Sequence, residues 1–191
     1  NAGTCSGQLS SLSTDRTKLV WFDGTADTSG ATSAIATGTW YHIAVTVGTS
    51  GATVVYLDGT SYMTDTANPS NYSLTQIDLA GTEYDGGSNG TEQLDANYAA
   101  IKIWNRVLSQ SEIQAEKPYA SVINATSLNA SYPMASGQTL ANTLADTSGN
   151  GYSWTIMGTP TVESAIPASL SWARAALTGT ATASITETDV V

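Results

Sequence analysis

The chain has 191 residues, a net charge of -10 and only 12% charged residues, so it lacks the basic surface that nucleic acids and anionic membranes require. Its apolar residues, 41% of the total, suffice for a buried core, yet no apolar run approaches the roughly 20 residues of a membrane span. We therefore expect neither a nucleic-acid partner nor membrane insertion. The length suits one all-β domain or two small ones.

Short strands separated by turns are predicted near the start of the chain. Leu19–Phe22 is an apolar run that an Asp-Gly pair ends, and the small, polar residues 25–36 are expected to form a loop. Apolar side chains alternate with others in residues 41–47, and residues 53–57 are again β-branched, which predicts a hairpin. We expect the apolar side of this hairpin to be buried between two sheets.

Turn residues organise the next part of the chain. Asp58-Gly59 predicts a tight turn after the hairpin, and residues 62–71 are expected to form a loop. Residues 74–81 predict another strand. Residues 86–90 are rich in glycine and predict a loop that either binds a ligand or connects two strands.

A strand at residues 98–104 leads into a helix whose ends can be predicted. Ser109 is a suitable N-cap, and Glu112, three residues later, completes a capping box. Pro118 ends the helix after about two turns. Such a short helix is expected to cover one end of a sandwich.

The back half repeats the pattern of strand, turn and strand. Residues 128–134 predict a strand, 146–151 a turn rich in Asp, Asn and Gly, and 152–157 a second strand. Ser171-Trp172 is expected to form a last packed edge. Residues 173–191 contain no aromatic residue and are interpreted as a linker or the start of a following module.

Three motifs in series carry a family resemblance. They are Gly38-Thr39-Trp40-Tyr41-His42-Ile43-Ala44, Val55-Tyr56-Leu57-Asp58-Gly59, and Ala100-Ile101-Lys102-Ile103-Trp104-Asn105-Arg106-Val107-Leu108-Ser109 with Glu112-Ile113. In residues 19–116 the chain resembles the laminin-G-like, concanavalin A-like lectin/glucanase superfamily. Residues 128–158 resemble a segment found at the start of such domains, and after them in bacterial and phage surface proteins. The resemblance implies an all-β fold, a jelly-roll sandwich of two antiparallel sheets with one short helix.

The resemblance also implies a domain organisation. We expect one sandwich over residues 1–172 that lacks its opening strands, since none is visible before residue 19. Residues 119–172 either begin a second, truncated repeat or pack on the front half and complete its sheets. We favour packing on the front half, because a lone strand, turn and strand would leave its aromatic residues without a core.

Catalysis is not expected from these residues. His42 is the only histidine, so a triad or a zinc site could use one imidazole at most. Glycoside hydrolases of the resembled superfamily place two glutamates and an aspartate at alternate positions on one strand. The most similar pattern of acidic residues in this chain, at residues 187–189, lacks the second glutamate and lies in the expected linker. We therefore predict that the chain is not an enzyme.

The loop around residues 86–90 holds candidate sugar contacts. Tyr84, Asp85 and Asn89 combine an aromatic ring, which can stack on a sugar, with a carboxylate and an amide that can bind hydroxyl groups. A plain connecting loop is the alternative.

The turn at residues 146–151 is a candidate Ca²⁺ site. Asp146 and Asn150 would supply oxygen ligands, with Asp58 added from another part of the chain. The alternative is a structural Asx-turn whose glycines adopt positive φ.

These observations favour a recognition module over an enzyme. We expect it to act extracellularly, at a cell surface or on a virion exterior, and to bind glycans weakly. The alternative is a structural subunit, such as a capsid decoration, tail fibre or filament, that contacts neighbouring surface or virion proteins or further copies of itself as a homo-oligomer.

Overall fold

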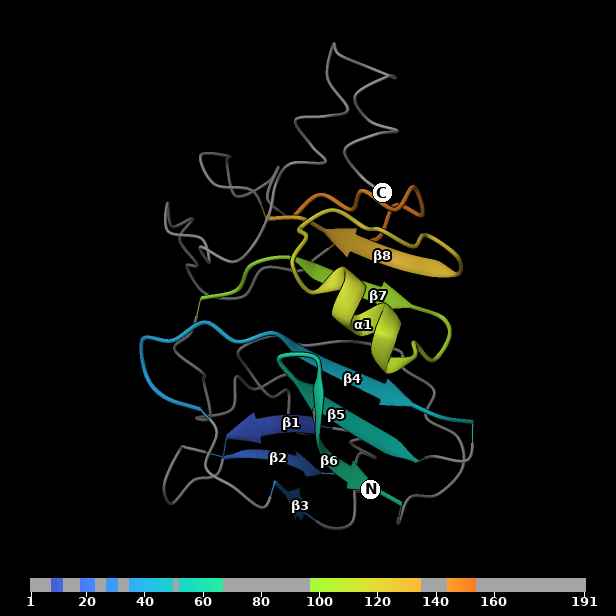
Figure 1. The fold of residues 1–191 in the computed structure, drawn as a ribbon. Coiled ribbons are helices and arrows are strands. Elements are labelled where there is room, and N and C mark those ends of the chain that lie inside the picture. The colour runs from blue at the N-terminus through green and yellow to red at the C-terminus, as the bar shows by residue number, and fades with distance from the viewer. Residues whose placement is uncertain are drawn as a thin grey trace, which may run out of the picture. The chain divides into compact units, whose positions relative to one another are not determined.

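The computed structural model describes residues 8–11, 18–22, 27–30, 35–49, 52–66, 97–134 and 144–153 (Figure 1). The chain divides into two compact units, Asn1–Ala96 and Asn97–Val191. Every strand pair in the described residues is antiparallel, and these residues contain one helix. This confirms the predicted all-β class with one short helix.

The first unit contains a sheet in the order β1-β2-β3, formed by Gln8–Ser11, Leu19–Phe22 and Asp27–Ser29. The predicted strand β2 is confirmed with its bounds. β1 lies where no strand was predicted. β3 contradicts the loop predicted over residues 25–36: its three polar residues carry no strand pattern and are held by pairing with β2.

The second sheet of this unit has the order β4-β5-β6, formed by Ile43–Val47, Thr53–Leu57 and Thr60–Asp65 (Figure 1). The β4–β5 hairpin is confirmed. The turn at Asp58 and Gly59 is also confirmed, with φ of 52° and 78°, as a two-residue hairpin turn requires. The loop predicted from residue 62 is wrong as far as Asp65, because this turn returns the chain along β5.

Residues of both three-stranded sheets share one core. Leu19 and Trp21 of β2 cluster with Val55 of β5 and Met63 of β6, and all four are buried. Both sheets therefore contribute to one core in this unit, which agrees with the predicted sandwich.

The burial prediction fails at β4. By register Val45 lies opposite the buried Val55 and shares its face, yet Ile43 and Val45 are 42% and 38% exposed. β4 is an edge strand in the described order β4-β5-β6. The buried residues of the core cluster come from β2, β5 and β6, and none of them lies on β4.

The second unit contains β7 (Ile101–Trp104), α1 (Gln110–Glu116) and β8 (Leu128–Tyr132). β7 pairs with β8, and α1 lies beside β7 (Figure 1). The capping box at Ser109 is confirmed. β7 starts later than predicted, because Ala100 has a φ of 59°, which interrupts the extended chain.

Several predictions lie outside the described residues: the strand at 74–81, the loop at 86–90, the edge at 171–172 and the linker at 173–191. Tyr152 and Ser153 form no strand, and the rest of that predicted strand is likewise outside. β8 joins β7 in one sheet, but the extent of the domain over residues 1–172 stays a prediction. Within the described residues, no helix has the length and apolar character needed to span a membrane.

Candidate functional site

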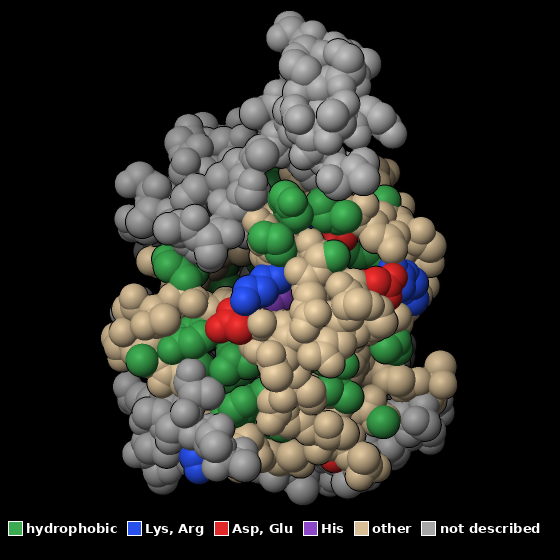
Figure 2. All heavy atoms as spheres, in the orientation of Figure 1, with side chains coloured by type: hydrophobic (Ala, Val, Ile, Leu, Met, Phe, Trp, Pro, Cys, Tyr) green, Lys and Arg blue, Asp and Glu red, His purple; other side chains and the backbone are tan. Residues whose placement is uncertain are grey.

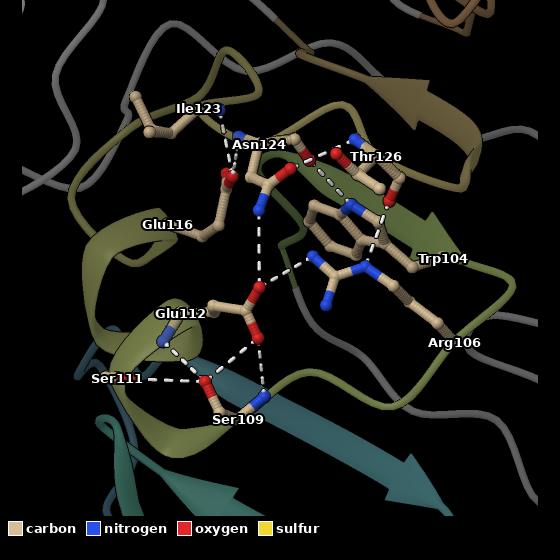
Figure 3. A network of polar contacts seen from close by, with 9 residues as sticks. All are labelled: Trp104, Arg106, Ser109, Ser111, Glu112, Glu116, Ile123, Asn124 and Thr126. Atoms are coloured by element: carbon tan, nitrogen blue, oxygen red, sulfur yellow. Dashed lines mark hydrogen bonds and ion pairs between the residues drawn. The ribbon is translucent and has the colours of Figure 1, made fainter.

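The third sequence motif forms a polar network around the start of α1 (Figure 3). Arg106, which follows β7, and Asn124, which precedes β8, both point toward Glu112 of the helix. The Arg106 Nη2 atom lies 2.7 Å from Glu112 Oε1, Asn124 Nδ2 donates to the same oxygen at 3.2 Å, and the Ser109 N–H donates to Oε2 at 2.8 Å. The bonds from Arg106 and then Ser109 lower the pKa of Glu112 to about 2.

The same motif attaches the segment after β7 to the segment before β8. Trp104 Nε1 donates to the Asn124 carbonyl at 2.8 Å, and Arg106 Nε donates to the Thr126 carbonyl at 3.0 Å (Figure 3). The conspicuous Trp-Asn-Arg part of the motif therefore has a structural role in this unit.

A buried ion pair completes this structure. Lys102 and Glu116 have side chains only 8% and 4% exposed, and Nζ lies 2.8 Å from Oε2. Lys102 Nζ also donates to the carbonyls of Glu116 and Tyr119, while Glu116 Oε1 accepts from the N–H groups of Ile123 and Asn124. All three donors of the ammonium group are thus used within the protein.

The turn after β8 is organised by one carboxylate. Asp146 Oδ1 accepts from the N–H groups of Ser131 and Ser148 at 3.0 and 2.9 Å, and Oδ2 accepts from Ser148 Oγ and the Tyr152 N–H at 2.8 and 3.1 Å. Burial, the largest influence, raises the pKa of Asp146, but these hydrogen bonds together outweigh it and lower the pKa to about 2.

The turn at residues 146–151 has the geometry of a structural Asx-turn, the alternative to a Ca²⁺ site. The bond from the Ser148 N–H to Asp146 makes an Asx-turn, and Gly149 and Gly151 have φ of 93° and 75°. Asn150 Nδ2 donates to the carbonyl of Asn129 in β8 at 2.8 Å. The turn is therefore attached along β8, as the structural interpretation predicts.

The proposed calcium ligands have other partners in the structure. Both Asp146 oxygens accept two hydrogen bonds, the Asn150 amide donates to β8, and Asp58 Oδ1 accepts from the His42 N–H at 3.1 Å. Within the described ranges, no group of three or more His, Cys, Asp or Glu side chains could hold a metal ion. The calcium set stays a prediction. The candidate sugar contacts Tyr84, Asp85 and Asn89 lie outside the described residues.

Sequence reasoning missed one feature of this turn, the exposed ring of Tyr152. The residue was expected to begin a strand, but 51% of it is exposed. Its N–H donates to Asp146, its carbonyl accepts from Tyr132 Oη at 3.4 Å, and its hydroxyl lies 3.5 Å from Asn129 Oδ1. The sequence feature that could have indicated this exposure is the position of Tyr152 directly after a turn rich in Asp, Asn and Gly.

Comparisons with known proteins bear on the family. A solved structure similar to the chain is an S-layer domain-containing protein (residues 221–444) from Clostridium thermocellum, at 17% identity and a TM-score of 0.37. The match covers 60% of this chain and 64% of that one, so the chain spans less than two thirds of its length. No curated protein matches the chain.

A family match covers more than half of the chain. Residues 5–114 match Laminin_G_3, described as the concanavalin A-like lectin/glucanases superfamily. The match begins before residue 19, where the resemblance was first visible, and ends within α1. The superfamily fold is a jelly-roll sandwich, which agrees with the antiparallel sheets described above. The chain belongs to the concanavalin A-like lectin/glucanase superfamily.

Proposed function

We propose that the chain is a non-catalytic recognition module that acts outside a cell or on a virion exterior and binds glycans weakly. The observation that carries this proposal is the match of residues 5–114 to a superfamily whose description includes lectins. Among the described residues on the face drawn in Figure 2, charged side chains are few, and apolar side chains lie in several places. Such a surface suits a neutral, hydroxyl-rich partner.

The state of three carboxylates of the second unit supports a non-catalytic role for them. Glycoside hydrolysis needs a carboxylic acid that keeps its proton near neutral pH. Glu112 and Asp146 instead have a pKa of about 2 and are fully ionised there. Glu116 is buried and bonded to Lys102 and to two backbone N–H groups. These three carboxylates therefore serve the fold.

Weak binding is expected because the candidate contacts are single residues of predicted loops and turns. A shallow contact buries little area, and the cost of immobilising a flexible sugar consumes much of the interaction energy. We expect dissociation constants of about 0.1 to 1 mM, which correspond to roughly 4 to 5.5 kcal/mol. The loop with Tyr84, Asp85 and Asn89 remains a proposed contact.

A glycan array with the full chain tests the proposal. We expect reproducible binding to at least one class of neutral glycan, and loss of that binding after heat denaturation. The absence of binding to every printed sugar would overturn the glycan part of the proposal. Measurable turnover of a polysaccharide would overturn the non-catalytic part.

A second function is favoured by a different observation. Ile43 and Val45 leave apolar surface exposed on β4, as expected of a structural subunit that contacts neighbouring proteins. A blank glycan array together with ordered assemblies in electron micrographs would favour this alternative.

A further inference from the structure

We propose that the Tyr152 ring is a stacking surface for one pyranose unit of a neutral glycan, with the Asn129 and Asn150 amides as its hydrogen-bonding partners. This inference rests on the proposed function and assigns it a site. The site lies on the turn after β8 and uses none of the residues Tyr84, Asp85 and Asn89 that the sequence singled out.

The backbone of Tyr152 is held in place before any ligand binds. The Tyr152 N–H donates to Asp146 at 3.1 Å, and its carbonyl accepts from Tyr132, which is only 3% exposed. These two hydrogen bonds fix the point from which the side chain extends, and the Tyr152 hydroxyl donates to Asn129 Oδ1 at 3.5 Å. Because less conformational entropy is then lost on binding, an exposed aromatic side chain of this kind is a suitable sugar contact.

Two amides belong to the same site: Asn129 contacts the Tyr152 hydroxyl, and Asn150 lies two residues before Tyr152 on the same turn. Asn150 uses its NH₂ group for the carbonyls of Leu128 and Asn129, and its Oδ1 accepts no hydrogen bond from the described part of the chain. Asn129 Oδ1 lies 3.5 Å from the Tyr152 hydroxyl, and its NH₂ group has no acceptor among the described residues. The turn and β8 therefore offer one amide acceptor and one amide donor in addition to the ring, which matches the hydroxyl groups of a sugar.

The site favours a particular class of sugar. Stacking needs a flat face of C–H groups, which pyranoses with equatorial substituents present, such as β-linked glucose and N-acetylglucosamine. Asp146 beneath the turn stays ionised at neutral pH, and the chain has a net charge of -10. Anionic sugars, such as sulfated or sialylated glycans, are therefore repelled.

The test uses the full chain with cellotetraose and the N-acetylglucosamine tetramer as probes, titrated by NMR. We expect Tyr152→Ala to weaken binding about tenfold, which corresponds to about 1.4 kcal/mol, because it removes the stacking surface. Tyr152→Phe keeps the ring and should retain affinity within about threefold. Tyr98→Ala is the matched control, because Tyr98 is another exposed tyrosine of the same unit, at 37%.

The variants are expected to stay folded, because both backbone anchors of Tyr152 are independent of its side chain. A measurement on the unmodified chain gives a second readout: saturation of the Tyr152 ring protons should transfer to sugar C–H protons of the bound probe. Absence of this transfer while the probe binds would overturn the stacking role.

The outcomes separate this inference from the proposed function. Binding that survives Tyr152→Ala at full strength overturns the Tyr152 site and leaves glycan binding intact. Failure of both tetramers, while other neutral glycans bind on an array, overturns the sugar class assigned to the site. Failure of every sugar overturns the site and the proposed function together.

Discussion

At the scale of single residues, the buried Lys102–Glu116 ion pair should contribute more to stability than a partly exposed pair does. Glu116→Ala should lower the free energy of unfolding by about 3 to 5 kcal/mol, because it leaves the Lys102 ammonium buried without its counter-charge. Urea unfolding, followed by tryptophan fluorescence, measures this change.

The second ion pair of the same unit supplies the control. Arg106 and Glu112 are 24% and 30% exposed, so water screens their interaction and also solvates either partner when the other is removed. Arg106→Ala should therefore cost clearly less than Glu116→Ala. Equal losses for the two variants would contradict the expectation that burial makes the Lys102–Glu116 pair the more costly one to break.

At the scale of elements, the turn after β8 should make stability depend on acid. The pKa of Asp146 is about 2 in the folded chain, below its ordinary value of 3.8, so the unfolded chain binds a proton more readily. The stabilisation is complete above the ordinary value and is lost as pH falls toward 2. Melting temperatures should fall between about pH 5 and pH 2.

Asp146→Asn is the variant that checks this expectation. It removes the titrating group, so the melting temperature should be lower at pH 7 and should depend less on pH. Part of the acid dependence should persist, because the pKa of Glu112 is also about 2. An unchanged pH profile would contradict the role of Asp146, and a rise in melting temperature on adding calcium would support the calcium interpretation instead.

Elements with a local signal could be predicted from sequence. The strand β4 and the capping box of α1 each arise from neighbouring residues, and both elements appear as predicted, although the apolar side of β4 is not the buried one. β1 and β3 have no such signal, because their strand conformation depends on pairing with β2. The end of β6 was misread as loop although the turn before it was recognised.

The same distinction explains what was missed at the candidate site. The residues of the Asx-turn and its glycines could be read from sequence, since they define the turn locally. The exposure of Tyr152 could not, because it depends on where Tyr132 and Asp146 hold its backbone. Likewise, the exposure of Ile43 depends on which strands lie over β4.

At the scale of the whole molecule, the predicted single domain over residues 1–172 has a thermodynamic consequence. The family match runs from residue 5 to residue 114 and so spans parts of both compact units. We therefore expect the two units to unfold together, because the residues matched by one family model belong to both. Two-state unfolding would then be detected equally by a probe in either unit.

The indole N–H signals of Trp21 and Trp104 supply one NMR probe in each unit. Val55→Ala opens the core of the first unit at a residue only 1% exposed and should cost about 2 kcal/mol or more, while Glu116→Ala acts in the second. If the units form one cooperative domain, each variant lowers the urea midpoint at both tryptophans by the same amount. If each variant shifts only the tryptophan of its own unit, the units are independent domains and the single-domain prediction is wrong.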